Sequence, residues 1–122
     1  MNKIAFLISM SVLAFAGVPS AMAQDSGLGL DGLHEQRREG NRICMVSHFH
    51  HGSSANQPNR KAAEAAAIKD WSGFTAWEYG SAWGSFNNAG SKKVECSTNG
   101  PSHGCSVEAR PCRPAGRAPK KK

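Results

Sequence analysis

A His-Phe-His-His run at 48–51 is the densest group of side chains able to do chemistry in this sequence of 122 residues. If the run lies on a strand, His48 and His50 project to the same side, with Cβ atoms about 7 Å apart. Two imidazoles so placed reach one Zn²⁺, Cu²⁺ or Ni²⁺ ion. A metal site needs a third protein ligand, for which His103 and His34 are the candidates. One function that the sequence indicates is therefore a periplasmic metal-binding module for Zn²⁺ or Cu²⁺, and no other cofactor is indicated.

The same imidazoles are the side chains that general acid–base catalysis uses most often. A small secreted hydrolase is therefore a second alternative. The sequence contains no Gly-x-Ser-x-Gly, no phosphate-binding loop and no His-Glu-x-x-His motif. No carboxylate is placed by its spacing to orient a histidine. Enzymatic activity is thus less favoured than a non-enzymatic function.

The C-terminal end is strongly basic in a chain whose formal net charge is +6, and it contains six cations and no acid from Ala109 onward. Basic extensions bind anionic polymers through counterion release and anionic membrane surfaces through direct attraction. The function that the sequence favours most is association with anionic envelope material, with nucleic acid bound only non-specifically. The candidate anion-binding residues are Arg113, Arg117, Lys120, Lys121 and Lys122.

The first 23 residues have the three-part layout of a secretory signal peptide. Lys3 provides the positive charge, an apolar run follows from Ile4 to Val18, and Ala21-Met22-Ala23 supplies small residues before a cleavage site. The run is too short for a comfortable membrane span, and no second run follows it. We therefore expect a periplasmic or secreted protein that begins at Gln24 and has no transmembrane segment after processing.

Composition divides the rest of the chain into three parts. Residues 24–41 are rich in glycine and charged side chains and are expected to be flexible. Residues 42–112 are the foldable domain, and residues 113–122 are a flexible basic tail. A domain this short buries little surface and usually needs covalent cross-links.

Four cysteines in a small exported domain indicate two disulfides, for which three pairings exist. The two segments that flank the turn at 99–102 are predicted to form a hairpin. That hairpin places Cys96 directly opposite Cys105, close to disulfide distance. Cys44 is then left to pair with Cys112.

A helix is predicted over 61–79, with Asn59 as its N-cap and Gly80 as its terminator. Alanine is dense in this segment, and apolar residues recur at steps of three and four. They form one stripe that is expected to face the core, namely Ala63, Ala67, Trp71, Phe74 and Trp77 or Glu78.

The other elements complete a small two-layer α+β domain. A strand is predicted over 42–49, a second short helix over 82–89, and the hairpin strands over 94–98 and 104–110. The order strand, helix, short helix, hairpin gives a three-stranded antiparallel sheet with helices on one face.

Several short motifs follow one another between residues 66 and 113. They are Ala-Ala-Ile-Lys-Asp-Trp at 66–71, Glu-Tyr-Gly at 78–80, Trp83, Ala89, Val-Glu-Cys at 94–96, Cys105 and Ala-Arg-Pro-Cys-Arg at 109–113. In these motifs the chain resembles small exported bacterial proteins that share a W…YG…W…C…C…PC pattern. The resemblance implies an exported protein of this fold. Because that group has no established activity, the resemblance implies no site residue.

Overall fold

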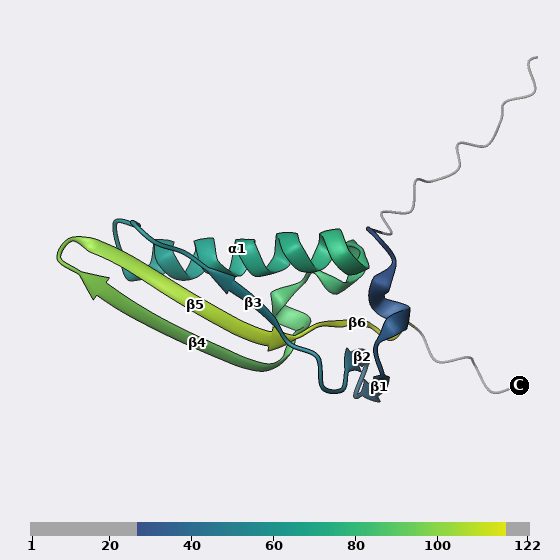
Figure 1. Cartoon of the computed structure of the whole chain (residues 1–122). Coiled ribbons are helices and arrows are strands. Elements are labelled where there is room, and N and C mark those ends of the chain that lie inside the picture. Colours follow the sequence, from purple (N-terminus) through teal and green to yellow (C-terminus); the bar gives the residue numbers. More distant parts are fainter. Residues whose placement is uncertain (1–26, 117–122) are drawn as a thin grey trace, which may run out of the picture.

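The helix predicted from the sequence organises the fold. In the computed structural model, which describes residues 27–116, α1 spans Arg60–Tyr79 and lies along one face of a three-stranded antiparallel sheet (Figure 1). The Asn59 side chain caps the helix by accepting a hydrogen bond from the Ala62 backbone N–H at 2.8 Å. Gly80, with a φ of 107°, ends it. The predicted signal peptide lies outside the described residues.

The long sheet under α1 has the strand order β3-β5-β4. β5 (Ser102–Arg110) is central, between β3 (His50–Ser53) and β4 (Gly90–Asn99). Cys96 and Cys105 are partners in the β4–β5 register and form a disulfide. The predicted hairpin and its disulfide are therefore confirmed.

A second antiparallel sheet, with the order β1-β2-β6, lies near the C-terminal end of α1 (Figure 1). It consists of β1 (Gln36–Glu39), β2 (Arg42–Met45) and β6 (Cys112–Pro114). Cys44 and Cys112 are register partners and form the second disulfide. This pairing is also confirmed, and the protein has the predicted α+β fold, with one sheet more than expected.

The single strand predicted over 42–49 is wrong, because its residues divide between β2 and the bend that precedes β3. Pro111 provides the physical reason. It separates β5 from β6, and because proline has no backbone N–H, a continuous ladder cannot pass through it. The Met45 N–H donates to the Pro111 carbonyl at 3.0 Å, and the chain then bends at Val46 and Ser47 before it joins the long sheet.

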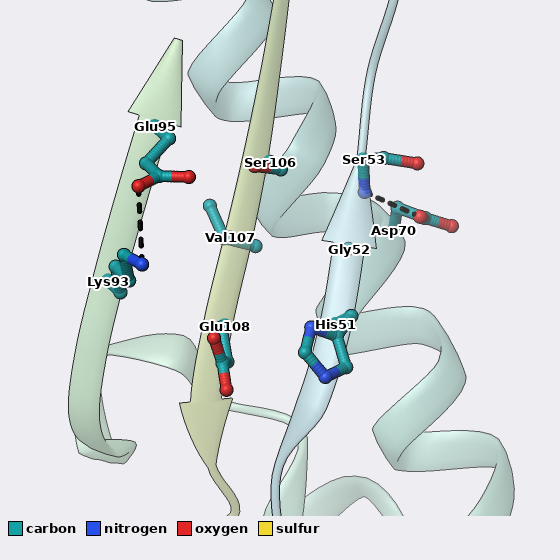
Figure 2. Close-up of a pocket in the computed structure, with 9 residues that line it drawn as sticks. All are labelled: His51, Gly52, Ser53, Asp70, Lys93, Glu95, Ser106, Val107 and Glu108. Carbon is teal, nitrogen blue, oxygen red and sulfur yellow. Dashed lines mark hydrogen bonds and ion pairs between the residues drawn. The ribbon is translucent and has the colours of Figure 1, made fainter.

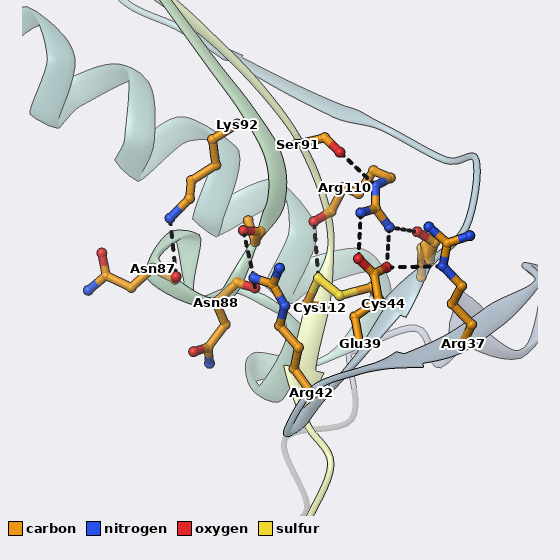
Figure 3. Close-up of a disulfide and its surroundings, with 12 residues drawn as sticks. Arg37, Glu39, Arg42, Cys44, Asn87, Asn88, Ser91, Lys92, Arg110 and Cys112 are labelled. Carbon is orange, nitrogen blue, oxygen red and sulfur yellow. Dashed lines mark hydrogen bonds and ion pairs between the residues drawn. A yellow bond between two sulfur atoms is a disulfide. The ribbon is translucent and has the colours of Figure 1, made fainter.

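Arg110 links the two sheets at this junction (Figure 3). Its guanidinium donates to both carboxylate oxygens of Glu39, at 2.6 and 2.9 Å, and to the Met45 carbonyl at 2.7 Å. The hydrogen bonds and charge of Arg110 hold the pKa of Glu39 at about 2. The Cys44–Cys112 disulfide lies beside this ion pair, so an ionic and a covalent link together attach the small sheet to the long one.

The segment 24–41, which we expected to be flexible, contains β1 and a 3-10 turn, η1 (Leu30–Leu33). The Leu28 N–H donates to the carbonyl of Trp77 at 3.0 Å, on the last turn of α1. This contact docks the N-terminal segment on the end of α1 and brings His34, the residue after η1, to the same place.

The second short helix predicted over 82–89 is replaced by two 3-10 turns, η2 (Ser81–Trp83) and η3 (Phe86–Asn88). Gly84 separates them where the loop approaches α1 closely. A Cβ atom at this position would lie 3.0 Å from the Cβ atom of Ala76. Close packing against α1 therefore decides how this loop folds.

The buried face of α1 is a stripe at steps of four residues: Ala63, Ala67, Trp71, Thr75 and Tyr79. Trp71 is fully buried, as predicted, whereas Phe74 and Trp77 are 45% and 60% exposed and do not belong to the core. The sequence pattern misses this outcome because Thr75 and Tyr79 carry polar groups. Burial of such groups is favourable only when tertiary partners satisfy them.

Candidate metal centre

His48, His50 and Glu78 converge at the C-terminal end of α1, and their ligand atoms all lie within 4.8 Å of one another. Glu78 belongs to the last turn of α1, His50 begins β3, and His48 lies in the bend before it. The two histidines do not share a strand as predicted. Their rings still meet, with centroids 5.0 Å apart.

His50 is held by hydrogen bonds that fix which ring nitrogen carries the proton. Its side chain is buried, and Nδ1 lies 2.9 Å from the Oγ1 atom of Thr75. The Thr75 hydroxyl donates its own proton to the Trp71 carbonyl at 2.7 Å. It must therefore accept a hydrogen bond from Nδ1–H, which leaves Nε2 of the neutral imidazole with a free lone pair.

That lone pair faces a carboxylate, which can only accept a hydrogen bond, and a hydroxyl, which can donate one. Nε2 of His50 lies 2.9 Å from a carboxylate oxygen of Glu78 and 3.1 Å from the hydroxyl of Tyr79. The hydroxyl of Tyr79 is also 3.1 Å from Nε2 of His34. A phenol has only one proton to donate, so it does not neutralise the contact between His50 and the carboxylate. The arrangement is one that a bound cation stabilises.

Burial sets the protonation of these groups. It lowers the pKa of His50 to about 4, assisted by the neighbouring His48 and His34, even though a carboxylate lies beside the ring. Burial also lowers the pKa of His48. Burial and the charge of Glu78 raise the pKa of Tyr79 to about 12. At neutral pH the two imidazoles are therefore in the uncharged form that binds metal ions.

The two candidates for the third ligand lie in different parts of the fold. His34 stacks on His48 with ring centroids 4.0 Å apart, so it borders the site, although Tyr79 occupies its Nε2 atom. His103 pairs with Thr98 near the tip of the β4–β5 hairpin, whereas His50 pairs with Ala109. Residues 103 and 109 are six positions apart on β5, which is about 20 Å at the rise of a strand. His103 therefore cannot share an ion with His50, and Glu78 is the candidate third ligand in its place.

Sequence reasoning missed Glu78 and Tyr79 as site residues, although a signal for them exists. Thr75 and Tyr79 continue the step of four that begins with the apolar residues of α1. Polar side chains on a buried stripe require polar partners elsewhere in the fold. In this sequence the histidine run supplies those partners.

The His51 side chain lies on the face of the long sheet that α1 does not cover (Figure 2). There it forms a row with Glu108 and Lys93, because the register pairs both of them with Glu108. The row borders a shallow hollow of about 330 Å³. Lys93 and Glu95 form an ion pair at 3.2 Å in which both side chains are well exposed. The hollow is lined by three carboxylates, those of Asp70, Glu95 and Glu108, and by one lysine, so its formal charge is negative.

The candidate anion-binding residues are only partly within the described chain. Arg113 belongs to β6, and its guanidinium lies over the ring of Trp83 at 5.5 Å from the centroid. Arg113 is therefore part of the folded domain and packs on Trp83. The other four candidates, Arg117, Lys120, Lys121 and Lys122, lie outside the described residues.

The chain matches no family model, no curated protein and no solved structure. Within residues 27–116, no helix is both long enough and apolar enough to cross a membrane. The two disulfides fit a protein that folds in an oxidising compartment. Fold and site together thus define a small, disulfide-linked α+β protein with a candidate histidine–carboxylate metal centre.

Proposed function

We propose that this protein is a non-enzymatic, exported metal-binding protein that holds one Zn²⁺ or Cu²⁺ ion through His48, His50 and Glu78. The contact between Nε2 of His50 and the Glu78 carboxylate, at 2.9 Å, carries the proposal. With Nδ1 of His50 donating to Thr75, an imidazole lone pair faces a carboxylate there, and the neighbouring donor is the Tyr79 hydroxyl, 3.1 Å from the same nitrogen. A divalent cation turns this unfavourable contact into two bonds.

The donor set fits the proposed ions. Imidazole nitrogens with a carboxylate oxygen suit Zn²⁺ and Cu²⁺, and sites with three protein ligands are common for zinc. At bond lengths of about 2.0–2.1 Å, ligand atoms lie about 3–4 Å apart, so His48 needs to move inward by about 1 Å, whereas Glu78 already lies 2.9 Å from His50. The His48 side chain is only partly buried and has room to do so, while hydrogen bonds hold His50 in place.

The residues that hydrogen-bond to His50 also support its role as a metal ligand. Metal-binding histidines usually donate their other ring N–H to an oxygen, which fixes the ring and raises its basicity. Thr75 provides that oxygen at 2.9 Å, and Thr75 is in turn fixed by its bond to the Trp71 carbonyl. Tyr79 and His34 form a further layer next to Nε2 of His50.

The proposal places this centre in the periplasm or outside the cell, in keeping with the predicted signal peptide and the two disulfides. The association of the basic C-terminus with anionic envelope material stays a prediction. In that arrangement the tail would hold a metal-binding domain close to an anionic surface.

Calorimetric titration of tag-free, chelator-treated protein with Zn²⁺ and with Cu²⁺ tests the proposed function. We expect one ion per chain, bound more tightly than two histidines alone allow. Glu78→Gln keeps the shape of the side chain and removes its charge, so it should weaken binding about tenfold or more. The matched control is Glu64→Gln, on the same helix about 20 Å away at its rise per residue.

A second pair of variants tests the histidines. His48→Ala should weaken metal binding strongly, while His103→Ala, at the hairpin tip, should not change it. Binding that is absent, or that is equally strong in Glu78→Gln and His48→Ala, would show that the cluster is only a hydrogen-bonded part of the fold.

A further inference from the structure

Three protein ligands leave a divalent ion with at least one open coordination position, which water or another molecule fills. His34 and Tyr79, which lie next to the ligands, are poorly suited to fill this coordination position. Nε2 of His34 is hydrogen-bonded to Tyr79 at 3.1 Å, and the phenol of Tyr79 is a poor ligand while it keeps its proton. The open position therefore depends on what the surroundings of the ion admit.

A shallow pocket of about 300 Å³ opens beside the three ligands and connects them with solvent. It is lined by His48, Phe49, His50, His51, Phe74 and Glu78. Its volume is at the lower end of the range for ligand sites, which limits an occupant to a small molecule. The pocket gives a molecule from solution direct access to the ion.

Phe49 and Phe74 provide an aromatic surface in this pocket. The two side chains are 37% and 45% exposed, so neither is needed to fill the core. The ring of Phe74 packs against that of His50, with centroids 4.9 Å apart, and its remaining surface faces solvent next to the ligands. An aromatic group bound there would stack on Phe74 and cover apolar surface.

The net charge of the metal-loaded centre indicates what kind of ligand would bind in the pocket. One divalent cation, two uncharged imidazoles and one carboxylate leave the centre with a net charge of about +1. An anionic oxygen donor balances that charge and is a good ligand for Zn²⁺ or Cu²⁺. An aromatic body attached to the donor reaches the phenylalanines.

We infer that the metal-loaded protein binds a small aromatic carboxylate, with the carboxylate on the ion and the ring against Phe74 and Phe49. The inference rests on the proposed metal-binding function and names the class of ligand that this centre takes. Carboxylate coordination provides binding, and the aromatic wall provides the preference for an aromatic over an aliphatic acid.

Titration of the Cu²⁺-loaded protein with benzoate and with acetate, followed by electron paramagnetic resonance of the copper, tests the inference. Both acids should change the copper spectrum in a saturable way. Benzoate should bind about two- to tenfold more tightly than acetate, which is the range expected for one aromatic contact. Phe74→Ala should remove this preference, which is read as the ratio of the benzoate and acetate affinities measured in the same copper-loaded variant.

Trp77→Ala is the matched control, because Trp77 is an exposed aromatic residue one turn along α1 and does not line the pocket. It should keep the benzoate preference. If copper binds but neither acid changes its spectrum, or if benzoate shows no preference that Phe74→Ala removes, the ligand inference is wrong while the metal-binding proposal stands. If neither Cu²⁺ nor Zn²⁺ binds stoichiometrically, both are wrong; if only Zn²⁺ binds, calorimetric titration of the zinc-loaded protein with the two acids decides the ligand inference.

Discussion

The two halves of α1 bury the same face of one helix but meet different surroundings. In the N-terminal half the buried residues are Ala63, Ala67 and Trp71, which pack against apolar side chains of the long sheet. In the C-terminal half they are Thr75 and Tyr79, whose hydroxyls meet His50. One helical stripe thus provides stability at one end and a candidate binding site at the other.

The difference shows how a small domain can bury a polar cluster at little cost. Buried polar groups destabilise a fold when they lack partners. Within residues 27–116, no buried side-chain nitrogen or oxygen is without one. The apolar half and the disulfides supply the free energy of folding that allows the polar half to bury the His50 ring.

The largest expected effect is on the apolar half. Trp71→Ala should lower the free energy of unfolding by about 3–5 kcal/mol, because it leaves a large cavity in the core. It also removes the hydrogen bond from Nε1 to the His50 carbonyl at 3.0 Å. Urea unfolding measures the loss, with Trp77→Ala as the control, which should change stability by only about 0.5 kcal/mol. Equal effects of the two variants would contradict the division of α1 into a buried and an exposed face.

The next effect concerns the link between the two sheets. Glu39→Gln leaves the Arg110 charge, on a side chain only 7% exposed, without its counter-ion. The free energy of unfolding should fall by about 3 kcal/mol, the lower limit for breaking a buried pair. Glu95→Gln, which removes an exposed ion pair, is the control and should have little effect.

The ion pair between Glu39 and Arg110 also predicts how the stability of the protein depends on pH. The pKa of Glu39 is about 2 in the folded protein and about 4.5 in the unfolded chain. Its contribution is therefore complete above about pH 4.5 and is lost as the pH falls towards 2, because the unfolded chain takes up the proton first. Urea midpoints measured through this range should fall less in Glu39→Gln than in the natural protein. Parallel pH profiles would mean that the ion pair does not act on stability.

A smaller effect sharpens the comparison within α1. Thr75→Val makes the polar half resemble the apolar half, keeps the shape of the side chain and removes the acceptor for Nδ1–H of His50. It should cost about 1–3 kcal/mol of stability. It should also weaken Zn²⁺ binding about tenfold or more, because the ring loses its support. The control is Thr98→Val at an exposed position near the end of β4. Unchanged Zn²⁺ affinity in Thr75→Val would separate Thr75 from the site.

The smallest effect on stability is expected from the C-terminus. Truncation after Gly116 removes Arg117 and three lysines but leaves β6 intact. The urea midpoint should not change, while binding to anionic vesicles should fall and lose its dependence on salt concentration. Vesicle binding that survives truncation with the same salt dependence would move the anion-binding surface to the folded domain.

The sequence by itself determined the features that follow from short-range rules. The turn at 99–102 brings Cys96 opposite Cys105, and elimination then pairs Cys44 with Cys112. Asn59 and Gly80 mark the ends of α1, and the position of Trp71 on the alanine stripe predicts its burial. Each of these conclusions depends on neighbours in the chain or on one regular period.

Tertiary structure alone decided the features that depend on contacts between distant segments. Pro111 divides the sheet, so of residues 42–49 only 42–45 form a strand, β2, and the rest lead to β3 in the other sheet. Thr75 and Tyr79 replace Phe74 on the buried face because His50, from another element, satisfies their hydroxyls. Glu78 lies next to His50 because the last turn of α1 packs against the start of β3, which is also a contact between distant segments. Burial of a polar side chain is decided by its partners, and no local period in the sequence specifies where those partners come from.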